Sequence, residues 1–87
     1  MVSRKLMIKY PTGLHLRPAG VLCDTARRFQ SNITFRRGNN ISNAKSLLSV
    51  LGAGVRYGDE IEIICEGEDE QEALETVIAV IEDGFGA

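Results

Sequence analysis

Residues 11–20 have the sequence PTGLHLRPAG, and they mark the point where a strand ends and a helix begins. Before this stretch, residues 2–9 (VSRKLMIK) have the alternation of a strand, and Pro-Thr-Gly is a turn sequence. After it, apolar residues recur at three- and four-residue steps, which predicts a helix from residue 16 to about residue 29. These apolar residues are Ala19, Leu22, Ala26 and Phe29.

The remaining elements follow from the same periodicities. Residues 32–37 (NITFRR) and 60–66 (EIEIICE) alternate apolar and polar side chains, which predicts two strands. The turn GNN leads into a short strand around Ile41, and a short helix begins near Ser46 and ends at Gly52. A last helix begins at EDEQ, and Gly84 ends it. The order β-α-β-β-α-β-α predicts an α+β domain, with helices covering one face of a mostly antiparallel sheet.

Length and composition predict one globular domain over residues 1–87, with 44% apolar residues. No apolar run approaches the roughly 20 residues that cross a bilayer, so we expect no membrane insertion. The first residues lack the apolar core of a signal peptide, which favours the cytoplasm. Cys23 and Cys65 form no metal-binding pair, and we expect them to be buried as small apolar residues. The sequence therefore predicts neither a metal nor a cofactor.

The charges are divided between the two halves of the chain. Residues 1–45 contain nine Lys or Arg and one acid, a balance of +8, whereas residues 46–87 contain one base and eleven acids, a balance of −10. This segregation predicts two faces of opposite charge. A basic face is suited to phosphate or to an acidic protein. Nucleic acid is disfavoured, because the chain has a net charge of −2 and has no RNA-binding aromatic motif.

His15 is the only histidine of the chain, and it occupies the N-cap position of the first predicted helix. Histidine is not a favoured N-cap residue, and a local rule broken at one position is typical of a functional site. The first turn of a helix offers free N–H groups and the positive end of the helix dipole, and Arg17 adds a guanidinium suited to phosphate. A neutral imidazole nitrogen beside such an anion site indicates phosphoryl transfer through a phosphohistidine.

Each candidate also has a simpler interpretation. His15 could be a surface histidine without a role, because H-x-R-P is a short pattern. Ser46 could be only the N-cap of the short helix. The leucines of that helix, Leu47, Leu48 and Leu51, could be ordinary core residues. Three leucines in five residues cannot all face inward on so short a helix, so we expect at least one to be exposed. The run EGEDEQE is a solvated helix start, where Asp69 and Glu72 fit a capping box.

Three separate segments resemble the HPr family, the histidine-containing phosphocarriers of the bacterial phosphoenolpyruvate:sugar phosphotransferase system. PTGLHLRPAG is similar to the active-site segment of that family, and NAKSLLSVLGAG is similar to its second motif. GEDEQEAL resembles the start of its last helix. The resemblance covers essentially the whole chain in order. It implies an HPr-like open-faced sandwich, a four-stranded antiparallel sheet with three helices on one face.

The resemblance also implies the functional residues and the partners. His15 is then phosphorylated on Nδ1 with the assistance of Arg17, and Ser46 is a regulatory phosphorylation site. Enzyme I is the implied donor and sugar-specific enzyme II A domains are the acceptors, with HPr kinase/phosphorylase and a catabolite-control regulator as further candidate partners. The family consists of carriers rather than enzymes, so we expect a chain without turnover of its own, and we expect it to be a monomer.

A small docking face around His15 is expected, because a relay protein must bind and release several partners. Its predicted members, besides His15 itself, are Leu16, Arg17, Gly20, Arg27, Leu47, Leu48 and Leu51. Leu16, Gly20, Asp24 and Ser49 depart from the residues most frequent in the family at these positions. Two alternative functions remain: a regulatory HPr-like protein acting mainly through Ser46, and a nitrogen-type phosphotransferase carrier. The regulatory paralogues of the family lack the histidine, so the presence of His15 in this chain favours the carrier function.

Overall fold

The order of helices and strands is the predicted one. The structure is a computed structural model that describes residues 1–86. Two of the strands, Asn32–Arg37 and Glu60–Glu66, have the predicted bounds. The elements are β1 (Val2–Met7), α1 (Leu16–Arg27), β2 (Asn32–Arg37), β3 (Asn40–Asn43), α2 (Leu47–Gly52), β4 (Glu60–Glu66) and α3 (Glu70–Glu82).

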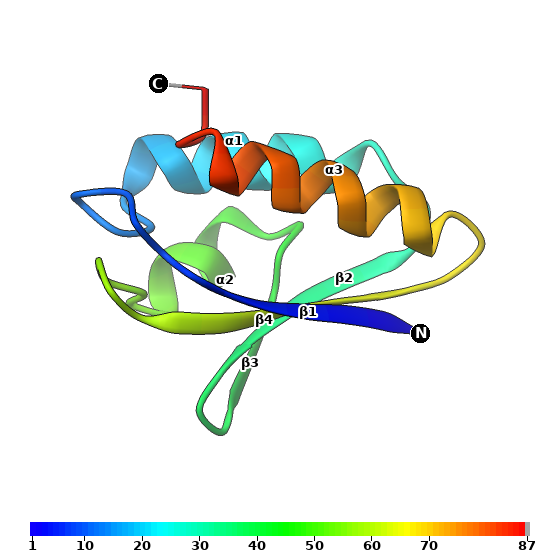
Figure 1. Ribbon diagram of the computed structural model, residues 1–87, viewed down its shortest axis with the longest axis horizontal. Helices are drawn as coiled ribbons and strands as arrows, with labels where there is room; N and C mark the ends of the chain where they lie inside the picture. Colours follow the sequence, from blue (N-terminus) through cyan, green and yellow to red (C-terminus); the bar gives the residue numbers. More distant parts are fainter. Residues whose placement is uncertain (87) are drawn as a thin grey trace.

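The four strands form one antiparallel sheet in the order β1-β4-β2-β3. Strand β4 therefore lies between β1 and β2, although two helices and two strands separate it from β1 along the chain. The helices cover one face of this sheet, with α1 and α3 side by side above it (Figure 1). This arrangement is the α+β open-faced sandwich that the sequence predicts.

The core lies between the covered face of the sheet and the helices. Phe35 of β2 is paired with Ile63 of β4, and Ile33 is paired with Cys65, so the apolar residues of the two strands share one face. Leu22 of α1 and Val77 of α3 are completely buried against them. Both cysteines are free and buried, as predicted. Burial raises the pKa of the Cys65 thiol to about 11, so this group remains a neutral part of the core.

Two boundaries differ from the sequence prediction. Strand β1 ends at Met7 rather than Lys9, because its partner β4 begins at Glu60. Ile8 instead exchanges hydrogen bonds with Gly58 and Asp59, in the loop that precedes β4. Helix α1 ends at Arg27, two residues earlier than predicted. Arg28 is its C-cap residue, and its N–H donates to the Thr25 carbonyl in a tightened last turn.

The predicted capping box at the start of α3 is wrong. Asp69 is the N-cap residue, but its carboxylate makes no cap hydrogen bond. It accepts hydrogen bonds from the backbone N–H groups of Gln30 and Ser31, each at 2.9 Å, and from the Ser31 hydroxyl. Ser31 is almost fully buried, so its N–H needs a partner within the protein. Asp69 therefore links the α1–β2 connection to the β4–α3 connection instead of stabilising its own helix.

The predicted division into a basic and an acidic face is also wrong for the sheet. Strand β4 of the acidic half lies between β1 and β2 of the basic half, and ion pairs join the halves. Arg36 of β2 pairs with Glu62 of β4, and Arg37 pairs with Asp59 at 2.9 Å. The division survives only among the helices, where the basic residues of α1 are arginines and every charged residue of α3 is an acid. No helix within residues 1–86 has the length and apolar character needed to span a membrane.

Candidate functional site

His15 is the N-cap residue of α1, as predicted. Its backbone is extended, with φ −79° and ψ −174°, and its carbonyl accepts the hydrogen bond of the Ala19 N–H at 2.8 Å. Its side chain makes no cap hydrogen bond, and the residue is exposed. The imidazole therefore stands at the start of the helix without the capping role that a serine or aspartate would perform there.

The first turn of α1 retains free hydrogen-bond donors. Within residues 1–86, the N–H groups of Leu16 and Arg17 donate to no acceptor, and Pro18 has no N–H. The guanidinium of Arg17 is exposed and makes no ion pair with the described residues. Two backbone donors and one free cation thus lie next to His15. Such a set is suited to the oxygens of a phosphoryl group.

The loop before His15 is held by the turn that follows α2. The N–H of Leu14 donates to the Val55 carbonyl at 3.0 Å, and both residues are buried. Gly13 has φ +66°, and a Cβ atom at this position would lie 2.4 Å from the Val55 oxygen and 2.7 Å from the Arg56 Cα. Only glycine fits this close approach. The backbone at residues 55–56 therefore fixes the position of the chain two residues before His15.

The turn at residues 54–59 is itself fixed by side chains. Arg37 donates to the Gly54 carbonyl at 2.7 Å and to the Asp59 carboxylate at 2.9 Å, and that carboxylate also accepts from the Arg56 N–H at 2.9 Å. The hydrogen bond from the Arg56 backbone, followed by that from Arg37, lowers the pKa of Asp59 below its ordinary value. This support was not predicted. The segment RYGD at residues 56–59 indicates a turn, but no local pattern indicates its contact with Gly13.

Helices α1 and α2 contact each other and carry the remaining predicted residues. Leu16 and Arg17 follow His15 directly, whereas Arg27 is the last residue of α1, about 16 Å along the helix axis from its start. Leu16 is 59% exposed and Leu48 is 82% exposed, whereas Leu47 and Leu51 are half-buried against the core. The expectation that at least one leucine of α2 is exposed is therefore confirmed. Gly20 is half-buried on α1, with open space where a Cβ would lie.

Arg27 and Ser46 lie where α1 meets the start of α2. Arg27 is exposed, and its Nε donates to the Lys45 carbonyl at 3.0 Å. Ser46 is the N-cap of α2, and its hydroxyl accepts a hydrogen bond from the Ser49 N–H at 3.2 Å. Ser46 thus performs the structural role that the simpler interpretation gives it. The residue is only half-buried, so the cap does not enclose it.

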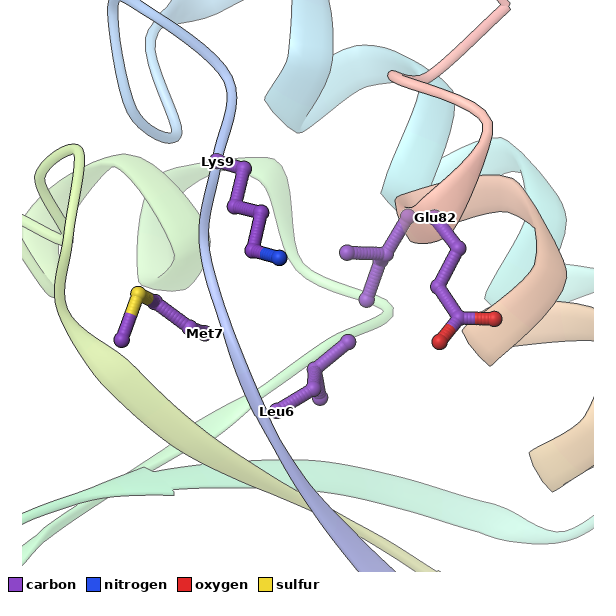
Figure 2. Close-up of a pocket in the computed structure, with 5 residues that line it drawn as sticks. Leu6, Met7, Lys9 and Glu82 are labelled. Carbon is purple, nitrogen blue, oxygen red and sulfur yellow. The ribbon is translucent and has the colours of Figure 1, made fainter.

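A groove of about 310 Å³ lies elsewhere, between the end of β1 and the end of α3. Leu6, Met7, Lys9, Ile81 and Glu82 line it. Figure 2 shows Leu6 and Lys9 on one side of the chain and Met7 on the other, with Glu82 coming from α3. The groove includes neither His15 nor Arg17. Among residues 1–86, no group of three or more His, Cys, Asp or Glu side chains could hold a metal ion.

Comparisons with known proteins agree on one family. The family described as "PTS HPr component phosphorylation site" matches residues 2–83. The HPr-like protein Crh of Bacillus subtilis is 37% identical over 95% of this chain and 98% of its own. The phosphocarrier protein NPr of Proteus mirabilis is 37% identical over 94% of this chain and 92% of its own. The crystal structure of HPr-C-His from Thermoanaerobacter tengcongensis has a TM-score of 0.96 and 38% identity, covering 100% of this chain and 98% of that one.

Proposed function

Because the chain belongs to the PTS HPr family of phosphocarriers, we propose that it carries its phosphoryl group on Nδ1 of His15. The observation that carries this proposal is the uncapped imidazole of His15 at the start of α1, beside the free N–H groups of Leu16 and Arg17. A histidine that capped the helix through Nδ1 would use that nitrogen as a hydrogen-bond acceptor, so Nδ1 would not be free to react. We propose one HPr-like domain over residues 1–87.

The transfer step is an in-line displacement at phosphorus. Nδ1 of His15 attacks the phosphoryl group on the donor's phosphohistidine, the donor's P–N bond breaks, and a P–N bond forms on His15. The N–H groups of Leu16 and Arg17 and the Arg17 guanidinium hold the phosphoryl oxygens. Passing the group to an acceptor repeats the displacement with the roles reversed. The chain is regenerated only by its partners, so we propose that it is a carrier and not an enzyme.

The proposed donor is phospho-enzyme I, and the proposed acceptors are sugar-specific enzyme II A domains. His15 is exposed rather than recessed in a cleft, which suits reaction with a protein partner. Leu16 and Leu48 offer exposed apolar contacts, and Gly20, Leu47 and Leu51 are half-buried on the same two helices. Arg17 and Arg27 offer positive charge. We propose that the chain docks through this surface as a monomer. Contacts of this kind bury less than about 1,200 Å² and dissociate quickly.

We propose Ser46 as the regulatory phosphorylation site, with HPr kinase/phosphorylase and a catabolite-control regulator as candidate partners. A phosphate on Ser46 would place about −1.5 to −2 charges beside exposed Leu48. The docking surface would then contain a phosphate dianion. Removing this dianion from water against an acidic partner would cost free energy, through both desolvation and charge repulsion. Phosphorylation of Ser46 would therefore slow transfer to His15 without any change of His15 itself.

Two observations favour second candidates. Similarity to the HPr-like protein Crh supports a function mainly in regulation through Ser46, and similarity to the phosphocarrier NPr supports a nitrogen-type carrier. A protein that acted only through Ser46 would need neither the free imidazole of His15 nor Arg17. This favours the carrier function. The nitrogen-type carrier would use the same chemistry with different acceptors.

The experiment is a reconstituted relay. Purified enzyme I, labelled phosphoenolpyruvate and an isolated enzyme II A domain are combined with the wild-type chain or with His15→Ala. We expect label on the A domain only when the wild-type chain is present. Sugar-type and nitrogen-type A domains in parallel reactions identify the acceptor class. Label that reaches an A domain equally well through His15→Ala would contradict the proposed function.

A further inference from the structure

Phe85 has a backbone conformation that phenylalanine rarely adopts. Its φ is +59°, and among residues 1–86 it is the one non-glycine residue with a positive φ. Its neighbours Gly84 and Gly86 have φ +70° and +77°, so three successive residues have positive φ after α3 ends. A side chain with a Cβ is unfavourable in this region, and a bulky residue there is an outlier. Glycine would fit position 85 with less strain, so the contacts of the Phe85 ring must offset the strain.

The ring of Phe85 is buried and contacts Tyr10. Phe85 is 5% exposed, and its ring meets that of Tyr10 edge to face, with centroids 5.5 Å apart and planes 85° apart. The backbone of Phe85 is fixed as well, because its N–H donates to the Val80 carbonyl at 2.9 Å. The N–H of Gly84 donates to the Ile81 carbonyl at 3.1 Å, and the two bonds form a Schellman motif at the end of α3. The end of this helix therefore holds the ring in one place.

Tyr10 begins the turn that leads to His15. Its carbonyl accepts a hydrogen bond from the Gly13 N–H at 2.9 Å, which closes a four-residue turn that ends two residues before the histidine. The loop after β1 and the end of α3 lie at the same end of the molecule (Figure 1). Residues 55–56 fix the last residue of the turn, Gly13, and Phe85 contacts its first residue. Both ends of the turn are thus held by segments distant in sequence.

We propose that Phe85 is a positioning residue for His15 and acts through Tyr10. The Phe85 ring fixes Tyr10, and the turn that begins at Tyr10 sets where the imidazole stands relative to the N–H groups of Leu16 and Arg17. An in-line displacement is sensitive to this alignment, since small displacements of a reacting group slow such steps strongly. The inference rests on the proposed function. Phe85 is buried, so it acts by fixing the loop and not by contacting a partner.

A role in core packing alone predicts a different result. If the Phe85 ring only filled the core, removing another buried side chain of α3 with a similar loss of stability would have the same effect on transfer. Leu74 provides this control, because it is 7% exposed and lies in the first half of α3, whereas Phe85 follows the other end of the helix. Leu74→Ala removes core contacts and leaves the contact between Phe85 and Tyr10 in place.

The test compares Phe85→Ala, Tyr10→Ala and the double variant with Leu74→Ala. Transfer from phospho-enzyme I is measured in single turnovers at saturating enzyme I, at a temperature where circular dichroism shows every variant folded. We expect Phe85→Ala and Tyr10→Ala each to slow transfer about tenfold, while the affinity for enzyme I changes less than about twofold. The double variant should be no slower than the slower single variant, because both changes remove one contact. Leu74→Ala should lower the Tm and leave the rate within about twofold of wild type. Tyr10→Phe keeps the ring and should restore the rate.

The hydrogen exchange of the Gly13 amide tests the inference without any partner protein. Phe85→Ala should accelerate this exchange at least about tenfold more than Leu74→Ala does, because the turn opens locally. If the wild-type chain accepts no phosphoryl group, the proposed function is wrong, and this exchange alone decides whether Phe85 fixes the turn through Tyr10. Equal exchange in the two variants would overturn the inference. So would equal slowing of transfer by Phe85→Ala and Leu74→Ala, or a double variant slowed by the product of the two single effects.

Discussion

Replacing Gly13 by alanine tests whether the turn after α2 holds the loop that carries His15. Gly13 has φ +66°, and a left-handed backbone costs a non-glycine residue about 1–2 kcal/mol. The new methyl group would also lie 2.4 Å from the Val55 oxygen, so the two segments must separate. Separation breaks the hydrogen bond from Leu14 to Val55, which contributes about 0.5–1.5 kcal/mol. Together these terms predict a loss of about 1.5–3.5 kcal/mol in the free energy of unfolding.

Gly38→Ala is the matched control. Gly38 has φ +59° in the β2–β3 hairpin, and nothing lies within 4 Å of the Cβ position. It therefore incurs the backbone term of about 1–2 kcal/mol without the collision. The entropic effect of alanine on the unfolded chain is the same in both variants and cancels from their comparison.

Urea denaturation and phosphotransfer assays measure the two consequences. We expect Gly13→Ala to unfold with a free energy about 1 kcal/mol below that of Gly38→Ala, which corresponds to a Tm about 4–8 °C lower for a domain of this size. Transfer to His15 should slow only in Gly13→Ala, because only that change displaces the loop before the histidine. Equal destabilisation by the two substitutions would refute the close approach of Gly13 to residues 55–56.

Three further predictions concern the surface and the acid stability of the protein. Leu48→Asp should weaken binding of enzyme I in a titration while leaving the Tm unchanged, because the side chain is 82% exposed; a change confined to the Tm would refute its docking role. Ser46→Asp should slow transfer from phospho-enzyme I with an unchanged fold by circular dichroism, and an unaltered rate would leave Ser46 as a helix cap only. The hydrogen bonds from the Ser31 hydroxyl, then from the backbone N–H groups of Gln30 and Ser31, lower the pKa of Asp69 below its ordinary value of 3.8. The stability that ionised Asp69 contributes is therefore present above pH 3.8 and is lost as the pH falls through the pKa of Asp69 in the folded protein. Ser31→Ala should therefore flatten the acid limb of a stability-against-pH curve, and an identical limb in both proteins would contradict this assignment.

The sequence was sufficient for the elements and for the position of His15. Periodicity located β2 and β4 to the residue, because both strands are half-buried and alternate strictly. His15 could be placed at a helix start because Pro-Thr-Gly ends the strand-like alternation of residues 2–9, and the helical spacing of apolar residues begins at Leu16. That at least one leucine of α2 is exposed followed from the length of this helix, which is too short to bury three, but the structure was needed to identify it as Leu48.

The remaining features depend on contacts between segments that are distant in sequence. Asp69 has the spacing of a capping box with Glu72, yet it bonds Ser31, 38 residues earlier in the chain. The +8 and −10 halves do not form two faces, because β4 inserts between β1 and β2 and brings Glu62 to Arg36. No local pattern contains these pairings. They follow from strand order, which periodicity alone leaves open.

The most direct measurement of the central claim is the intact mass of the chain after incubation with enzyme I and phosphoenolpyruvate. We predict a gain of one phosphoryl group that is lost in acid and stable in base, as expected for a phosphoramidate. The same incubation of His15→Ala should give no gain, whereas Ser46→Ala should behave as the wild type does. An acid-labile phosphoryl group on His15→Ala, or no gain by the wild-type chain, would contradict the assignment of His15 as the phosphoryl carrier.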